Sequence, residues 1–322
     1  MNIGGIISLL GEDWTRMREL IRAGLHTDVA LLEDVNGQVF AHSGKMLRPL
    51  ISLLVAKALG EPNDDSLHYA AASELLHNAT LMHDDVADES SERRGAPTVS
   101  AMLGPSAAVL VGDFWLAKAV ETVFVTERFS RVVKFFSDTL SDLAEGEMYQ
   151  LEKASSADTT EEDYFRIIQC KTASLFVAAA VSGACSVDAP EELQEAAKAY
   201  ATALGTAFQI KDDILDYAGT GELGKPVGMD LKEQKITLPL IGALSTLEDE
   251  SPVRDKILHI HEHPEYCGQL HSFVIERGGI EYAAARLQEY IDKAVDALRP
   301  VPDSPARDAL VEIARFNAFR QV

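Results

Sequence analysis

The sequence predicts an all-α protein. Apolar residues recur with helical periodicity over nearly all of the 322 residues, and the alternation of apolar and polar residues that indicates a strand is essentially absent. Signals for helix starts agree with this fold class. Thr159 and Glu162 have the spacing of a capping box, and Pro190 precedes an acidic first turn. Ser304 and Pro305 fit an N-cap followed by proline at the first helical position.

The periodic segments give the order of the expected helices. In chain order they are residues 11–34, 46–59, 65–87, 105–125, 130–153, 161–186, 191–217, 236–248, 266–277, 279–298 and 305–320. Polar stretches at 88–98 and 218–235 are expected to be loops beside a functional site. No linker divides the chain, so we expect a single domain over residues 1–322.

Composition is that of an ordinary globular chain, with 47% hydrophobic and 25% charged residues. The formal net charge of −22 argues against nucleic acid as a partner, because that affinity depends on a basic surface. Cys170, Cys185 and Cys267 lack paired spacing, which predicts a reducing compartment and no structural zinc. No basic residue precedes the apolar patch at 3–10, and no apolar run is expected to cross a bilayer. We therefore expect a cytoplasmic protein.

The sequence Asp-Asp-x-x-Asp occurs twice, each time within a helical pattern. The two copies are Asp84, Asp85 and Asp88, and Asp212, Asp213 and Asp216. On a helix, residues i and i+4 lie one above the other and residue i+1 lies about 100° away, so each copy forms one carboxylate face. Oxygen ligands suit Mg²⁺, which keeps several waters and bridges to substrate phosphates. The two faces predict divalent ions held between two helices and a polyphosphate.

A single acidic triplet on a helix is usually solvated surface. Here the surroundings argue for a site, because each triplet ends a helix with a substantial apolar surface. Leu76 and Leu81 precede the first triplet, and Leu204 and Phe208 precede the second.

Several side chains able to bind a polyphosphate lie near these faces in the sequence. Ser73, His77 and Thr80 fall close to the helical stripe of Asp84, which favours a site over the more common structural role of a histidine on an apolar face. Arginine binds phosphate in a bidentate manner, and lysines in a glycine-rich stretch can close over a site. The remaining candidates are Lys45, Arg48, Arg93, Arg94, Lys171, Thr172, Gln209, Lys225 and Lys235.

These motifs together resemble the trans-isoprenyl diphosphate synthases of the polyprenyl synthetase family. In family order they are Gly-Lys-x-x-Arg-Pro at 44–49, His-Asp-Asp-x-x-Asp at 83–88, Arg-Arg-Gly at 93–95, Gly-Asp at 112–113, Lys-Thr at 171–172, Phe-Gln at 208–209, Asp-Asp-x-Leu-Asp at 212–216 and Gly-Lys at 224–225. The combination, within residues 43–240, is highly specific. Ser43 is one departure, since the family often has glycine there.

The resemblance implies the isoprenoid-synthase fold, a helical bundle around a central cavity, and three Mg²⁺ ions bound by oxygen ligands. It also implies head-to-tail addition of isopentenyl diphosphate to an allylic diphosphate. By motif, the metal ligands would be Asp84, Asp88, Asp212 and Asp216, and the wider catalytic set would add Asp85, Asp213 and Lys171. Isopentenyl diphosphate would be held by Lys45, Arg48, His77 and Arg94. The allylic diphosphate would be held by Arg93, Lys171, Thr172, Gln209, Lys225 and Lys235.

Product length in this family depends on residues before the first aspartate, where bulky side chains four and five positions upstream stop elongation early. Here those positions are Thr80 and Ala79, with Leu76 and Ser73 further down the helix. None is aromatic, so the resemblance favours a long product, hexaprenyl to nonaprenyl, for isoprenoid or quinone biosynthesis. A floor set elsewhere, for example by Trp115 or a partner subunit, and a short farnesyl or geranylgeranyl product stay open.

Other functions fit the residues less well. A class I terpene synthase shares the first aspartate motif but normally replaces the second, which is intact here. A modulating partner subunit is expected to have lost aspartates, and a di-iron bundle needs Glu-x-x-His spacing that is missing. Glu145, Glu147 and the series His259, His261 and His263 are interpreted as helix surface or core. The family also implies a homodimer with at most peripheral membrane contact.

Overall fold

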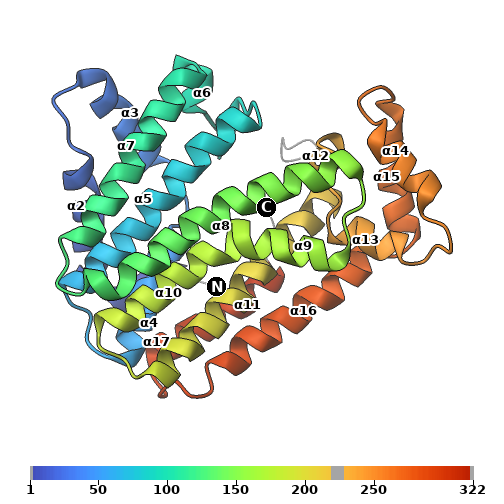
Figure 1. Cartoon of the computed structure of the whole chain (residues 1–322). Coiled ribbons are helices and arrows are strands. Elements are labelled where there is room, and N and C mark those ends of the chain that lie inside the picture. The colour runs from blue at the N-terminus through green and yellow to red at the C-terminus, as the bar shows by residue number, and fades with distance from the viewer. Residues whose placement is uncertain (1–2, 219–227, 320–322) are drawn as a thin grey trace.

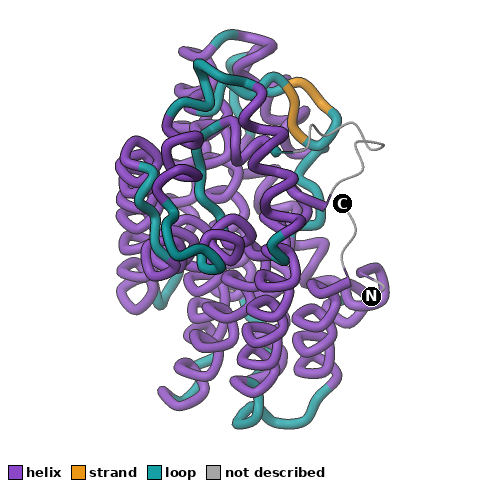
Figure 2. The backbone as a smooth tube through the Cα atoms, turned by 90° about the vertical axis from the view of Figure 1, so that its right-hand side faces the viewer, coloured by secondary structure: helices purple, strands orange, loops and turns teal. Residues whose placement is uncertain are grey.

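The computed structural model describes residues 3–218 and 228–319, most of which lie in helices (Figure 1). The helices are α1 (Ile3–Leu10), α2 (Glu12–Leu25), α3 (Ala30–Ala41), α4 (Leu47–Leu59), α5 (Asp64–Ala87), α6 (Val99–Leu103), α7 (Pro105–Phe124), α8 (Phe129–Ser156), α9 (Glu161–Ile168), the π-helical turn η1 (Gln169–Ala173), α10 (Ser174–Ser186), α11 (Glu191–Ala218), α12 (Met229–Lys232), α13 (Leu238–Leu244), α14 (Ser251–Leu258), α15 (Glu265–Glu276), α16 (Gly279–Ala297) and α17 (Pro305–Phe319). Strands β1 (Glu92–Arg93) and β2 (Ala96–Pro97) pair as one small antiparallel hairpin (Figure 2). The predicted all-α class is confirmed.

The long helices pack around two hydrophobic clusters. The first contains buried side chains of α2, α4, α5, α7 and α10, and the second contains those of α9, α13 and α15. Helices α11 and α16 contribute to both clusters, with Leu204 in the first and Ile210 in the second. Figure 1 shows α11 and α16 running beside one another through the molecule. Continuous helices therefore join the two clusters, and the single domain over residues 1–322 stays a prediction.

Two helix starts and one break refine the predicted boundaries. The helix expected over 11–34 is interrupted after Leu25, where the Thr27 N–H donates to Glu33 Oε2 at 3.0 Å and the side chain thereby supports the start of α3. The capping box of α9 lies one residue later than predicted, at Thr160 and Asp163. Ser304 caps α17 as predicted, accepting the Arg307 N–H at 3.2 Å.

The short helices α1 and α14 were not among the predicted helices, because eight residues give too few apolar repeats to show a period. The helix predicted over 161–186 widens into η1 at Gln169–Ala173. The expectation that no run could cross a bilayer was wrong for this segment, since Glu161–Ser186 passes by length and mean hydropathy of 1.4. However, 67% of that window is buried inside the protein, as in a core helix.

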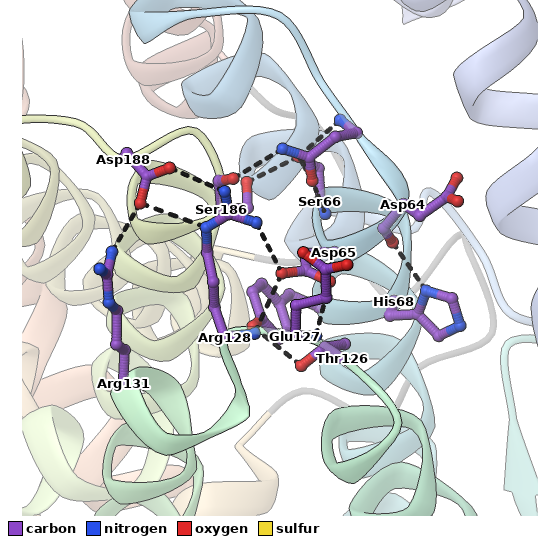
Figure 3. Close-up of polar contacts among 12 residues, drawn as sticks. Asp64, Asp65, Ser66, His68, Thr126, Glu127, Arg128, Arg131, Ser186 and Asp188 are labelled. Carbon is purple, nitrogen blue, oxygen red and sulfur yellow. Dashed lines mark hydrogen bonds and ion pairs between the residues drawn. The ribbon is translucent and has the colours of Figure 1, made fainter.

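An ion-pair network joins the start of α5 to two chain connections (Figure 3). Buried Asp65 accepts from Arg128 Nη1 at 3.0 Å and from the backbone N–H groups of Glu127 and Arg128 at 3.2 Å each. Arg128 also pairs with Asp188 at 2.7 Å, and Arg131 reaches the same carboxylate at 2.6 Å. The network ties α5 to the α7–α8 connection and to the turn between α10 and α11.

We predict that Arg128→Ala lowers the free energy of unfolding by about 2 kcal/mol, because it leaves a buried carboxylate with only backbone partners. Arg131→Ala is the matched control, since its side chain is exposed and Asp188 keeps Arg128, so a loss below about 0.5 kcal/mol is expected. Urea denaturation of both variants measures this. Equal losses would show that the Asp65 pair carries no special weight.

Candidate active site

The first aspartate face lies at the carboxyl end of α5. Asp85 is buried and accepts from Arg93 Nε at 2.7 Å. None of the described hydrogen bonds goes to the side chains of Asp84 or Asp88, and Asp88 is exposed. Burial raises the pKa of Asp84 to about 6, opposed by Lys171. The middle aspartate is therefore tied to the protein, whereas the outer two are available to a ligand.

The second face lies near the end of α11, and its middle aspartate, Asp213, is also hydrogen-bonded by the protein. Asp213 is 4% exposed and accepts from the Tyr164 hydroxyl at 2.5 Å and from Gln209 Nε2 at 2.9 Å. Burial raises its pKa to about 6, although both hydrogen bonds act to lower it. Asp213 is therefore held by α9 and by the preceding turn of its own helix.

Asp216, the last aspartate of the second face, is hydrogen-bonded to the start of α12. Its two carboxylate oxygens accept the N–H groups of Met229 at 3.1 Å and Asp230 at 3.2 Å, at the start of α12. Burial raises its pKa and these backbone hydrogen bonds lower it. Asp212 lies one residue before Asp213 and is partly buried. The role of Asp216 as a metal ligand stays a prediction, and in this structure its carboxylate anchors α12.

The π-helical turn η1 carries the predicted Lys-Thr pair. Lys171 Nζ donates to Gln150 Oε1 at 3.1 Å and forms an ion pair with Glu147, both on α8. The Thr172 hydroxyl donates to Gln209 Oε1 on α11 at 2.8 Å. π-Helical turns inside α-helices often mark functional sites. Here the wide turn places consecutive residues against two different helices.

Two glycines make room for this wide turn. A Cβ added at Gly146 of α8 would lie 2.7 Å from Cys170 Cβ and 2.9 Å from Lys171 Cγ. A Cβ at Gly205 of α11 would lie 2.6 Å from Ala173 Cα. Side chains at either position would therefore push η1 away from its neighbours, so the glycines set the depth at which Lys171 and Thr172 sit.

A cavity of about 140 Å³ lies between η1, α8, α9 and α11. Its lining residues are Gln150, Ala154, Thr159, Tyr164, Ile167, Ile168, Lys171, Thr172, Gln209, Asp213, Asp230, Lys235, Ile236 and Thr237. The predicted residues Lys171, Thr172, Gln209, Asp213 and Lys235 are thus brought together around one space.

Two lysines link the aspartate faces electrostatically. Lys171 acts on Asp84, as described above. Lys235 forms an ion pair with Glu233. Burial alone would lower the pKa of Lys235, but Glu233, Asp88 of the first face and Asp230 raise it. Lys171 on η1 and Lys235 just after α12 therefore both interact electrostatically with carboxylates at the end of α5.

A second basic group lies beside the first face. Arg48 stacks on Phe176, with 4.5 Å from Cζ to the ring centroid, and burial lowers its pKa to about 10. Burial, Arg48, Arg94 and Arg93 lower the pKa of His77 well below its usual value. Glu74 is buried among these charges, and burial raises its pKa while Asn78, Arg48 and Arg94 lower it. Arg48, Arg93 and Arg94 therefore all act on His77, and Arg48 and Arg94 also act on the buried carboxyl group of Glu74, so the four predicted residues form one basic cluster.

The other predicted residues are placed less closely. Lys45 is exposed, with its Nζ 5.9 Å from the ring centroid of Phe316. Lys225 lies outside the described residues. Of the chain-length residues, Ala79, Leu76 and Ser73 are buried, whereas Thr80, one helical turn before Asp84, is only partly buried.

Three residues at the site were missed by sequence analysis. Tyr164 had no distinguishing signal, because a tyrosine on an amphipathic helix is usually core. Asp230 is partly buried near Asp213, Asp216 and Lys235, and burial with the two aspartates raises its pKa strongly. Glu147, interpreted above as surface or core, instead pairs with Lys171 and raises the pKa of Asp84. The position of Glu147, next to Gly146 and one turn before Gln150, was the only sequence signal that it lies at the site.

Comparison with known proteins bears on this geometry. A sequence model described as polyprenyl synthetase matches residues 29–271. The chain belongs to the polyprenyl synthetase family. Octaprenyl diphosphate synthase of Escherichia coli is 39% identical, over 99% of each chain. A nonaprenyl diphosphate synthase of Rhodobacter capsulatus, described as geranyl-diphosphate specific, is 39% identical over 98% of this chain and 97% of the relative.

A solved structure of a polyprenyl synthase from Caulobacter crescentus, complexed with calcium and isoprenyl diphosphate, superposes with a TM-score of 0.91. It is 34% identical and covers 100% of this chain and 98% of its own. The predicted family and the isoprenoid-synthase fold are confirmed by these comparisons.

We predict that Gly146→Ala reduces turnover about 10- to 100-fold, because a displacement of Lys171 by about 1 Å is enough to misplace a charge that must meet the substrate. Gly268→Ala is the control, since that helical glycine has no atom within 4 Å of an added Cβ. Steady-state rates and thermal melts of both variants measure the effect. Equal activities would show that η1 tolerates the displacement.

We further predict a pH-dependent stability difference for Asp84→Asn in the presence of a chelator. Because the pKa of Asp84 is raised to about 6, the stability linked to its proton is present below the unfolded value and is lost as the pH rises through 6. The variant should therefore be more stable than wild type by about 1–2 kcal/mol above pH 7, and by about half as much near pH 5. Thermal melts at both pH values test this, and a pH-independent difference would contradict it.

Proposed function

We propose that this protein makes long-chain all-trans polyprenyl diphosphates by repeated addition of isopentenyl diphosphate to an allylic diphosphate. The observation that carries the proposal is the pair of carboxylate faces on α5 and α11. Lys171 and Lys235 interact electrostatically with the first face, and both line one cavity. Full-length similarity to synthases named for octaprenyl and nonaprenyl products supports the long chain.

The proposed reaction breaks the bond between C1 and oxygen of the allylic diphosphate, and the electron pair leaves with the diphosphate. The double bond of isopentenyl diphosphate supplies the electrons of the new carbon–carbon bond, and loss of a proton restores a double bond. We propose that the departing diphosphate takes this proton. Diphosphate leaves slowly unless its growing charge is stabilised, so fixed cations are needed where that charge develops. Lys171 and Lys235 lie at the cavity in positions to meet it.

The carboxylates fit a divalent cation. Carboxylate oxygens are the ligands that Mg²⁺ takes, and the side-chain carboxylates of the outer aspartates of the first face accept none of the described hydrogen bonds. When bound, Mg²⁺ would neutralise negative charge on the leaving diphosphate. Among the described residues no three His, Cys, Asp or Glu side chains form a metal site by themselves. This fits ions completed by substrate phosphate. The proposed ligands are Asp84, Asp88, Asp212 and Asp216, with three Mg²⁺ per site as the family implies.

The assignment of the two diphosphates follows the family motifs and divides the second basic group between them. Isopentenyl diphosphate is proposed to be held by Lys45, Arg48, His77 and Arg94, which lie just before α4, on α4, on α5 and on the hairpin. The allylic diphosphate is assigned to Arg93, Lys171, Thr172, Gln209, Lys225 and Lys235. No side-chain nucleophile is needed, because the carbon–carbon bond forms directly between the substrates.

We also propose a homodimer with α7 and α8 in the interface. Exposed apolar side chains gather on these helices and on the turn between them, including Leu110 (69% exposed), Val125 (70%) and Met148 (67%). Apolar patches of this kind commonly mark contacts between subunits. A monomer in sedimentation equilibrium would contradict this part. A cytoplasmic location is proposed too, and the three free cysteines fit it.

The test incubates purified protein with Mg²⁺, labelled isopentenyl diphosphate and either geranyl or farnesyl diphosphate, and resolves the dephosphorylated products by length. Prenols of thirty or more carbons are expected from wild type. A stop at fifteen or twenty carbons would refute the long product but keep the reaction. No condensation would refute the proposed function.

Thr80→Phe is predicted to shorten these products while keeping the first condensation, because Thr80 lies one turn from Asp84 and is only partly buried. Thr80→Val, which preserves the side-chain shape, is the matched control and should leave the length distribution unchanged. An unchanged distribution in Thr80→Phe would place the floor of the product channel elsewhere.

A further inference from the structure

The hydrogen bonds of Asp213 give each of its oxygens a protein donor. Tyr164, 3% exposed on α9, donates its hydroxyl to Oδ2 at 2.5 Å, and Gln209 Nε2 donates to Oδ1 at 2.9 Å. All three residues line the cavity that contains Lys171 and Lys235. An ionised carboxylate with two short, buried donors is fixed in orientation. Asp213 is therefore held as a stationary anion at the wall of the site.

The carboxylate also dictates the direction of the neighbouring hydrogen bonds. Asp213 can only accept, so Gln209 must present its amide N–H to it and its Oε1 to Thr172. The Thr172 hydroxyl accordingly donates to Gln209 at 2.8 Å. The resulting relay runs from η1 through α11 to α9. In this arrangement the hydroxyl hydrogen of Thr172 is donated to Gln209, so Thr172 belongs to the relay.

We propose that Tyr164 is a positioning residue, which fixes Asp213 and, through Gln209 and Thr172, holds η1 in register with the second aspartate face. The inference rests on the proposed function, because register matters only if Lys171 and the carboxylates of α11 act on one substrate. Residues that orient ligands from behind commonly affect affinity or activity 10- to 100-fold when changed.

Loss of the Tyr164 hydroxyl would affect the residues proposed to hold the allylic diphosphate. Asp213 would keep only Gln209, and a buried carboxylate that loses a donor turns to another partner. Lys235 already stabilises the charged form of Asp213 electrostatically. Lys235 would then be drawn toward Asp213 and away from the diphosphate, while Arg48, His77 and Arg94 would keep their surroundings.

The chain contains a matched control bond, whose acceptor lies on the same helix as Tyr164. Tyr282 of α16 donates its hydroxyl to Glu161 Oε2 at 2.5 Å, and Glu161 keeps a second partner in Arg286 at 2.6 Å. Glu161 lies three residues before Tyr164, and neither Glu161 nor Tyr282 lines the cavity. Tyr282→Phe therefore removes an equally short bond between a tyrosine and a carboxylate without touching the site.

The experiment compares Tyr164→Phe with Tyr282→Phe after both are shown to be folded by circular dichroism. For Tyr164→Phe we expect kcat/KM for the allylic diphosphate to fall about 10- to 100-fold, with KM for isopentenyl diphosphate changed less than about twofold. Calorimetric titration with inorganic pyrophosphate and Mg²⁺ should show weaker binding. Tyr282→Phe should match wild type in all three. Equal effects in the two variants, or equal losses for both substrates, would overturn the proposal.

A double-mutant cycle shows whether Tyr164 acts through Asp213. If it does, Tyr164→Phe should cost little further activity in an Asp213→Asn background, whereas independent roles would give multiplied losses and overturn the proposal. Thr172→Val tests the other end of the relay and should reproduce the selective loss. Failure of the proposed function appears separately, as wild-type protein that binds pyrophosphate but forms no prenyl product. The binding comparison between the two tyrosine variants would still decide the role of Tyr164.

Discussion

Burial of carboxylates is the constraint on which this site depends. A buried carboxylate must find hydrogen-bond donors, a cation or a proton. The middle aspartates of both faces, Asp85 and Asp213, find protein donors in Arg93, Tyr164 and Gln209. Asp84 does not, and its raised pKa expresses this lack of a partner. The faces are therefore divided into members that are fixed by the protein and members left to an external cation.

Helix α5 shows both solutions at its two ends. At its start, the Asp65 carboxylate accepts hydrogen bonds from Arg128 Nη1 and from two backbone N–H groups, so it serves the fold and not a ligand. The other end lies about 28 Å away, by helical rise over nineteen residues. There the carboxylates of Asp84 and Asp88 accept none of the described hydrogen bonds. One helix thus carries a satisfied carboxylate where the fold needs an anchor, and unsatisfied ones where a ligand is expected.

The sequence predicted the fold class and family because these depend on periodicity and on spaced polar residues. Both aspartate faces, and the grouping of Lys171, Thr172, Gln209 and Lys235, followed from helical geometry and motif resemblance. The π turn at Gln169–Ala173 did not follow, because its register depends on Gly146 and Gly205 from helices distant in sequence. Tyr164 was missed for the same reason, since its partner Asp213 lies 49 residues further along the chain.

The balance of charge around the cavity explains why divalent ions fit the site better than basic residues alone. The chain carries a net charge of −22, but exposed charges beyond about 8 Å are largely screened at physiological salt, so the local groups decide. Both cavity lysines are already paired, Lys171 with Glu147 and Lys235 with Glu233. Their net attraction for a diphosphate is therefore small until the carboxylates are neutralised. Cations held by the outer aspartates would add positive charge beside these ion pairs and so attract a diphosphate, which would couple metal binding to diphosphate binding.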